Sequence, residues 1–177
     1  MKRTGETSAI KSIGNSTTAS RDLMTPNDAK IILYLLSESV AARLRAHGLR
    51  CQTVAVSLRD KELVSFERQA RLSESTTASR DIARAAIDLV TANWKSGKPL
   101  RSLGVRGGEL VTETGRLQLD LFDEQKAAAS LLETAVDDIR RRFGQNSIQR
   151  CVMLTDCRLS GFNPKDDHVI HPVSFFR

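Results

Sequence analysis

Two stretches with the period of an amphipathic helix lie between segments that resemble strands, and this alternation constrains the fold more than any other feature of the sequence. Thr25 and Pro26 are typical of a helix start, as N-cap and first helical residue, and Gly48 is suited to end that helix. Between them an apolar stripe recurs at helical spacing at Ile31, Ile32, Leu35, Leu36, Val40 and Leu44. Residues 10–20 are rich in Ser, Thr and Ile, which predicts a strand before the helix.

The same pattern follows a second time along the chain. Residues 51–60 alternate apolar and smaller or polar side chains, and a turn at Asp60-Lys61 leads to a further strand within residues 62–72. A second helix is predicted with Ser79 or Thr77 as its N-cap, and residues 97–99 end it before a strand at residues 100–110. The stripe of this helix comprises Ile82, Ala86, Leu89, Val90 and Trp94.

The heptapeptide STTASRD occurs at residues 16–22 and 75–81, each time between a strand and the helix that follows. The first copy is expected to run along a strand and the second to begin a helix. The predicted class is α+β, with the order β-α-β-β-α-β. Such a chain builds an antiparallel or mixed four-stranded sheet with both helices on one face, and the uncovered face is the functional candidate.

The charge of the chain is +6 at pH 7 and is unevenly distributed. Residues 1–116 contain 19 of the 27 Lys and Arg but 12 of the 21 Asp and Glu. A basic domain attracts polyanions, although charge alone does not identify a nucleic-acid ligand. Three cysteines and no apolar run long enough for a membrane span or signal peptide lead us to expect a cytoplasmic protein without a membrane partner.

The sequence divides into four segments: a linker-like start at residues 1–9, the sheet domain at 10–112, a connector at 113–122 and a C-terminal region at 123–177. Asp123 is predicted to cap a third helix that Gly144 ends. The apolar stripe of that helix comprises Ala128, Leu131, Leu132, Ala135, Val136, Ile139 and Phe143. We expect an irregular tail from about residue 150 onward.

Four motifs resemble, in order and spacing, the C-terminal part of bacterial Y-family translesion DNA polymerases of the UmuC and DinB type. They are KSIGNSTTASRDL at 11–23, RSLGVRGGEL at 101–110, QLDLF at 118–122 and DDIRRRFGQNSIQR at 137–150. The resemblance implies that residues 10–112 form a little-finger domain, whose open sheet face lies against duplex primer-template DNA. Positions matching family DNA contacts are Ser12, Gly14, Asn15, Thr18, Arg50, Gln69, Arg71, Arg101, Ser102 and Arg106.

Alternation along the strands indicates which side chains share a face of the predicted sheet. Ser12, Gly14, Ser16 and Thr18 share one side of the first strand, and Glu67, Gln69 and Arg71 share a side of the third. Contacts from such residues to phosphates fix position without reading sequence. Glu67 is expected to be an unfavourable neighbour for a phosphate.

The resemblance also implies what this chain lacks. Polymerases of this family use paired palm carboxylates that hold two magnesium ions. No palm motif occurs, and Asp137-Asp138 and Asp166-Asp167 are interpreted as solvated acids. We therefore expect a non-catalytic region without a cofactor, which works together with a catalytic core that binds magnesium.

QLDLF resembles the peptide by which bacterial polymerases dock on the β sliding clamp. The predicted clamp-binding residues are Gln118, Leu119, Asp120, Leu121 and Phe122, with the Gln amide fixing register and the apolar side chains filling a pocket. Two structural interpretations remain open. Leu117, Leu119 and Leu121 alternate as in an edge strand, and Phe122 could pack against the third helix as a hydrophobic staple.

Cys151, Cys157, His168 and His171 are the residue types of a zinc site, but their C-x5-C and H-x2-H spacing does not match the usual ranges. We therefore expect no metal site. Two other functions stay open for the chain as a whole. One is an RNA-binding module, which would need aromatic side chains on the open strands, where only Phe66 is available. The other is a protein-interaction adaptor that does not bind DNA.

Overall fold

The computed structural model describes residues 10–94, 97–112 and 124–162. Its first six elements are β1 (Ser12–Leu23), α1 (Pro26–Ala46), β2 (Leu49–Asp60), β3 (Ser65–Thr76), α2 (Ser79–Asn93) and β4 (Leu100–Thr112). They are followed by α3 (Glu124–Phe143), the 3-10 helices η1 (Gln145–Ser147) and η2 (Cys151–Thr155), and α4 (Cys157–Ser160). The predicted α+β class and the order of the first six elements are confirmed.

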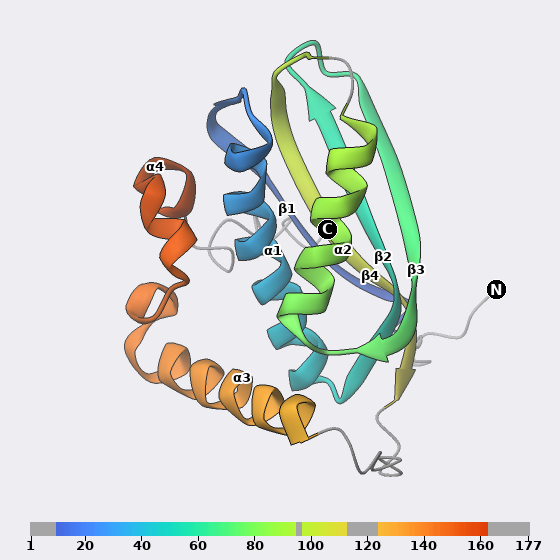
Figure 1. Ribbon diagram of the computed structural model, residues 1–177, viewed down its shortest axis with the longest axis vertical. Coiled ribbons are helices and arrows are strands. Elements are labelled where there is room, and N and C mark those ends of the chain that lie inside the picture. The colour runs from blue at the N-terminus through green and yellow to red at the C-terminus, as the bar shows by residue number, and fades with distance from the viewer. Residues whose placement is uncertain (1–9, 95–96, 113–123, 163–177) are drawn as a thin grey trace, which may run out of the picture.

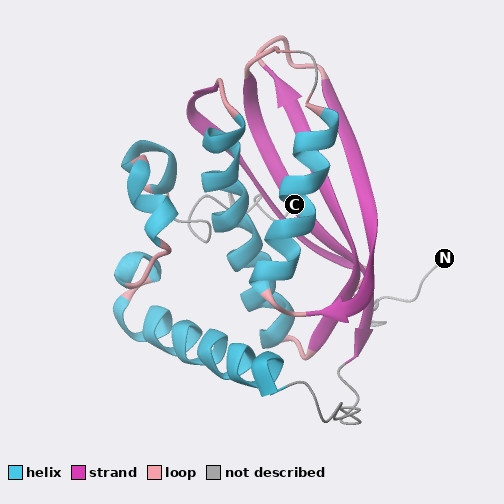
Figure 2. Ribbon diagram, viewed as in Figure 1, coloured by secondary structure: helices cyan, strands magenta, loops and turns pink. Residues whose placement is uncertain are grey.

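The four strands form one antiparallel sheet in the order β1-β4-β2-β3. Because β4 separates β1 from β2, and β2 separates β3 from β4, the two βαβ units are interleaved. Both α1 and α2 lie on the same face of the sheet (Figures 1 and 2). None of the helices described here covers the opposite face, which we call the open face. The prediction is confirmed in its antiparallel form.

The hydrophobic core lies between the covered face of the sheet and the helices α1 and α2. The sheet supplies inward side chains at every second position, and the helices supply the stripes predicted from the sequence. Both layers are almost free of solvent contact, which is the main source of stability for such a domain. The central members are Ile13, Val54, Val56, Leu58, Leu103, Val105, Ile32, Leu36, Val40, Leu44, Ile82, Ala86 and Val90.

Helix α1 begins and ends where the sequence predicts. The Thr25 hydroxyl accepts the Asp28 N–H at 3.2 Å, and the Asp28 carboxylate accepts the Thr25 N–H at 3.0 Å, which is a capping box. At the other end Gly48 adopts φ +61°, the left-handed conformation that glycine tolerates best. Local sequence signals therefore fix both ends of this helix.

The start of α2 differs from the prediction. Its N-cap is Ala78, which has no side-chain cap, and neither Ser79 nor Thr77 fills that role. The Thr76 hydroxyl accepts the Ala78 N–H and donates to the Asp81 carboxylate, both at 3.0 Å. The first copy of STTASRD lies entirely within β1, whereas the second spans the end of β3 and the first turn of α2, as expected.

Helix α3 packs on the helical layer through charged residues rather than through its apolar stripe. Glu38 of α1 accepts hydrogen bonds from Arg140 at 2.8 Å and from Arg150 at 2.6 Å, and both the Glu38 and Arg140 side chains are 8% exposed. Arg45 of α1 is paired with Glu133 and Asp137 of α3. These ion pairs, partly or fully withdrawn from water, hold the helix in place.

The predicted apolar stripe of α3 is correspondingly exposed. Leu131 and Phe143 are 73% and 74% exposed, and Leu132 and Ile139 also face solvent. The apolar stripe is therefore not the face of α3 that packs on the domain. The helix ends as predicted before Gly144, which adopts φ +96°. Beyond it, η2 and α4 give the segment before residue 163 more regular structure than the predicted irregular tail.

Candidate nucleic-acid interface

The strand register arranges the open face in four rows that each cross all four strands. Pairing places one residue of β1, β4, β2 and β3 side by side in every row, and alternation turns these residues away from the helices. In strand order the rows are Ser12, Gly108, Thr53, Arg71; then Gly14, Arg106, Ala55, Gln69; then Ser16, Gly104, Ser57, Glu67; and finally Thr18, Ser102, Arg59, Ser65. The predicted shared faces of the first and third strands are confirmed.

Small and hydroxyl-bearing residues dominate these rows. A Cβ at Gly104 would clash with the Ser57 hydroxyl and lie 3.0 Å from the Ser16 Cβ, and a Cβ at Gly108 would lie 2.8 Å from the Thr53 hydroxyl. The glycines therefore let neighbouring strands hold side chains close together without a protruding residue between them. The result is a low surface on which a phosphate backbone can approach the peptide groups closely.

Three arginine side chains extend from the open face. Arg106 of β4 is paired with Glu67 of β3, and both side chains are about half exposed. Arg71 of β3 lies 4.0 Å from the Glu109 carboxylate and 3.4 Å from the Gln52 amide oxygen. Arg59 of β2 donates to the Ser65 hydroxyl at 3.0 Å. Two of the three cations thus have acidic neighbours, which weakens the field that they present to an anion.

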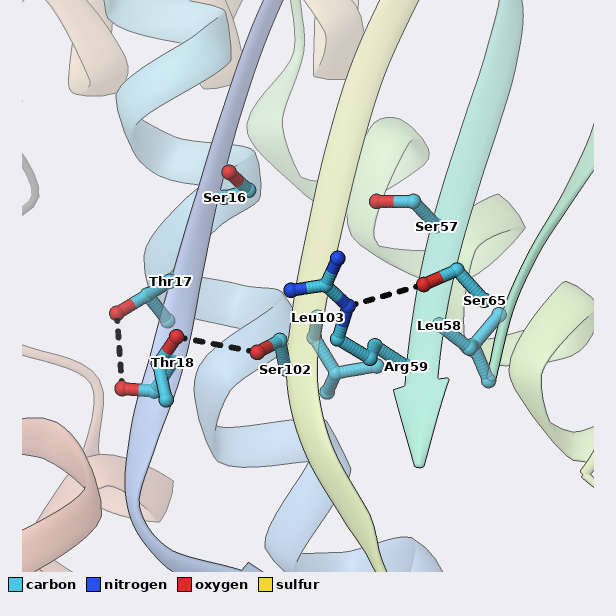
Figure 3. Close-up of a pocket in the computed structure, with 9 residues that line it drawn as sticks. All are labelled: Ser16, Thr17, Thr18, Ser57, Leu58, Arg59, Ser65, Ser102 and Leu103. Atoms are coloured by element: carbon cyan, nitrogen blue, oxygen red, sulfur yellow. Dashed lines mark hydrogen bonds between the residues drawn. The ribbon is translucent and has the colours of Figure 1, made fainter. Parts of the chain in front are cut away.

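Arg59 lies at a depression of about 590 Å³ at one end of the open face. Figure 3 shows its guanidinium extending over β4, with the hydroxyls of Ser57, Ser65 and Ser102 around it. The Thr18 and Ser102 hydroxyls share a hydrogen bond of 3.1 Å on the far side of β4. Sequence reasoning did not identify Arg59, although it alternates with Ala55 and Ser57 on one face of β2.

The structure places seven of the ten predicted DNA-contact residues in the rows of the open face. Gln69 and Arg71 come from β3, Ser12, Gly14 and Thr18 come from β1, and Ser102 and Arg106 come from β4. These seven share one surface, as the resemblance implies.

The other three predicted contacts lie elsewhere. Asn15 faces the helices, is 7% exposed and donates to the Ser39 hydroxyl of α1 at 3.1 Å. Placing it among the open-face contacts was therefore wrong, because neighbouring residues of a strand point to opposite faces. Arg50 donates to the Ser75 carbonyl at 2.6 and 3.1 Å, and Arg101 lies 3.6 Å from Asp22 beyond the last row.

Aromatic residues are absent from the four rows. Phe66 pairs with Leu58 on the covered face, where it packs against the core, and the Arg68 guanidinium lies 5.2 Å from its ring centroid. Base stacking on aromatic side chains is the usual basis of single-stranded RNA recognition by sheets. The open face therefore offers hydroxyls and cations to a backbone, and no stacking platform to a base.

Several other predicted features lie outside the described residues. These are the clamp-binding residues Gln118–Phe122 and the histidines His168 and His171 of the zinc hypothesis. Within the part of the chain that the structure describes, no group of three or more His, Cys, Asp or Glu is placed to hold a metal ion. No described helix is long and apolar enough to cross a membrane.

Comparison with known proteins extends the sequence resemblance. The model of the impB/mucB/samB family C-terminal domain matches residues 10–121. DNA polymerase IV of Acetivibrio thermocellus is 43% identical over 149 residues, which cover 83% of this chain and 37% of that protein. DNA polymerase IV of Pelotomaculum thermopropionicum is 35% identical over 146 residues, which cover 82% and 36%. The chain spans little more than a third of the length of these relatives.

Solved structures resemble the chain more distantly. A post-insertion binary complex of Dbh DNA polymerase aligns with a TM-score of 0.46 at 10% identity, over 57% of this chain and 29% of that chain. A complex of the beta-clamp processivity factor and the little finger domain of PolIV aligns with a TM-score of 0.45 at 15% identity, over 55% and 86%.

Proposed function

This chain belongs to the family of the impB/mucB/samB C-terminal domain, and from that premise we propose that its open face binds the backbone of duplex DNA as the little-finger domain of a translesion polymerase. The observation that carries the proposal is the arrangement of the four rows. Seven residues that match family DNA contacts lie together there, on the one face of the sheet that no described helix covers.

The chemistry of the rows suits a phosphate backbone. Glycine, alanine and serine keep the surface low, so that hydroxyls can reach phosphate oxygens, and the arginines supply charge. Such contacts are independent of base sequence. The isolated chain should bind with a Kd of order 10⁻⁴ to 10⁻⁶ M and with a steep dependence on salt. Binding that does not depend on base identity suits DNA synthesis across a damaged template.

The catalytic step belongs, in this proposal, to the part of the relatives that the chain does not cover. Nucleotidyl transfer needs carboxylates that hold magnesium ions in line with the reacting phosphate. We place that metal site in the catalytic core, and assign to this chain the positioning of primer-template DNA. The core is then a partner of the chain as well as the DNA.

Docking on the sliding clamp is the second part of the proposal. It rests on the sequence QLDLF at residues 118–122, which follows the sheet domain. A short peptide with an apolar anchor pair can bind a pocket through few residues and would leave the DNA-binding face unoccupied. The chain would thereby attach to clamp and DNA at the same time.

Anisotropy titrations with labelled duplex DNA, single-stranded DNA and RNA, at about 50 and about 200 mM salt, test the proposal. We expect preference for the duplex and a loss of affinity when Arg71 and Arg106 are both changed to alanine. The matched control changes Arg80 and Arg84, two exposed residues of α2, and removes the same charge from the helical layer. A preference for RNA, or equal effects of both double variants, would contradict the proposal.

A further inference from the structure

Arg59 stands apart from the other arginines of the open face because its neighbours are hydroxyls. Arg106 is paired with Glu67 and Arg71 with Glu109, and Arg101, which lies beyond the last row, is near Asp22. No described carboxylate lies within ion-pair distance of Arg59, whose guanidinium donates to the Ser65 hydroxyl through Nε. Its two terminal nitrogens are directed over β4 (Figure 3).

This difference decides which cation meets an incoming anion most easily. A phosphate that approaches Arg106 competes with the Glu67 carboxylate and is repelled by it. At Arg59 the phosphate meets a guanidinium that is already oriented by a neutral partner, so no ion pair has to be broken. A preorganised, uncompensated arginine binds an oxyanion more strongly than one that is already paired.

Hydroxyls around Arg59 complete a set of donors. Ser102 and Thr18 already share one proton between them, which leaves the second hydroxyl hydrogen of that pair free to donate outward. Ser57 and Ser16 border the depression on either side of Gly104, where the absent side chain keeps the floor open. The two non-bridging oxygens of a phosphodiester can thus receive hydrogen bonds from the guanidinium and from the hydroxyls around it.

We propose that Arg59, with the hydroxyls of Ser57, Ser65, Ser102 and Thr18, forms the principal phosphodiester seat of the open face. The inference rests on the proposed function and adds to it a residue that the family resemblance did not indicate. Arg106 lies two rows away, roughly 13 Å along the strands. The two arginines therefore contact different phosphates, with the unpaired Arg59 making the stronger contact.

The test compares single variants of the whole chain in anisotropy titrations with a labelled duplex of mixed sequence at two salt concentrations. Arg59→Ala should weaken duplex binding roughly five- to tenfold and lower the slope of log K against log salt by about 0.9. Arg106→Ala should weaken binding by less than Arg59→Ala does. Arg68→Ala is the charge-matched control, since Arg68 lies on the covered side of β3, and it should change binding by less than twofold.

A second variant distinguishes the loss of a contact with DNA from a change in folding. Ser102→Ala removes one hydroxyl from the seat and leaves every charge in place, so it should weaken binding without altering the salt slope. If Arg59→Ala matches Arg68→Ala while Arg106→Ala weakens binding, the seat is refuted and the open face retains its function. If the unaltered chain does not bind duplex DNA, or binds single-stranded RNA more tightly, the seat and the proposed function are both refuted.

Discussion

Glu67 of β3 and Arg106 of β4 form an ion pair across the open face, although β2 lies between their two strands. Strands two places apart in a sheet are separated by roughly 9.5 Å, and the pair spans this gap because the β2 residues beneath it are Ala55 and Ser57. The small side chains of β2 thus allow an acid to lie on the open face beside Arg106.

Replacing Glu67 with glutamine should strengthen duplex binding several-fold. The change removes a repulsive charge and frees Arg106 for a phosphate, so the salt slope should also become steeper by about one contact. Titration of the variant beside Asp88→Asn checks this, because Asp88 is exposed on α2 and its replacement changes the net charge equally. Equal gains in both variants would mean that Glu67 acts only through net charge.

Local signals in the sequence were sufficient for the elements and for the shared faces of single strands. Alternation predicts the outward side of β1 and of β3, and Thr25, Pro26 and Gly48 define α1. The rows themselves depend on strand order, which arises from pairing between residues far apart in the chain and has no local signature. Arg59 was missed for this reason, since its hydroxyl neighbours Thr18 and Ser102 come from other strands.

Asn15 and α3 show where a sequence pattern alone is not sufficient. Motif matching included Asn15 among the DNA contacts, although alternation along β1 already places it opposite Gly14. In α3 the apolar stripe is exposed, and Glu133, Asp137 and Arg140 face the domain because α1 presents Arg45 and Glu38 to them. Periodicity identifies the faces of a helix, and only the partner decides which of them is buried.

The orientation of α3 predicts an unusual pattern of mutational effects. Leu131→Gln and Leu132→Gln should each change the free energy of unfolding by no more than about 0.5 kcal/mol, because both side chains face solvent. Glu38→Gln should cost about 3 kcal/mol, since it leaves Arg140 buried without a counter-charge. Urea unfolding followed by circular dichroism measures all three. Leucine variants costing more than Glu38→Gln would show that α3 packs through its apolar stripe.

Acid sensitivity should depend on the cluster that joins β1, α1 and α4. Hydrogen bonding to Arg21 lowers the pKa of Asp28 to about 2, with the backbone N–H groups of Met24 and Thr25 adding to the effect, and Arg21 also lowers the pKa of Asp156. Asp28 therefore stays charged in the folded chain at a pH where it is protonated in the unfolded chain. The contribution of Asp28 to the free energy of unfolding, on the order of 1 kcal/mol, is present above about pH 4 and is lost as the pH falls toward 2.

Urea unfolding of the parent chain and of Asp28→Asn between about pH 2 and pH 6 checks this expectation. The variant should be less stable near neutral pH and should lose less stability on acidification. The Thr25 cap contributes to the difference near neutral pH, because Asp28 also accepts the Thr25 N–H. As long as the cap bonds persist, the cap does not contribute to the difference in how steeply the free energy of unfolding falls with pH. If the free energies of unfolding of the parent and of Asp28→Asn fall in parallel on acidification, Asp28 does not have this role.

Clamp binding should be separable from DNA binding along this chain. Gln118→Ala and Phe122→Ala should each reduce affinity for the β sliding clamp at least tenfold, because a short peptide depends on a few anchoring side chains. Both variants should bind duplex DNA as the parent does, since the peptide lies in sequence beyond the strands that carry the four rows. Arg59→Ala provides the converse control, with weakened DNA binding and unchanged clamp affinity. If clamp affinity survives both alanine replacements, QLDLF is not the docking peptide, and an edge strand or a staple for α3 becomes the better interpretation of these residues.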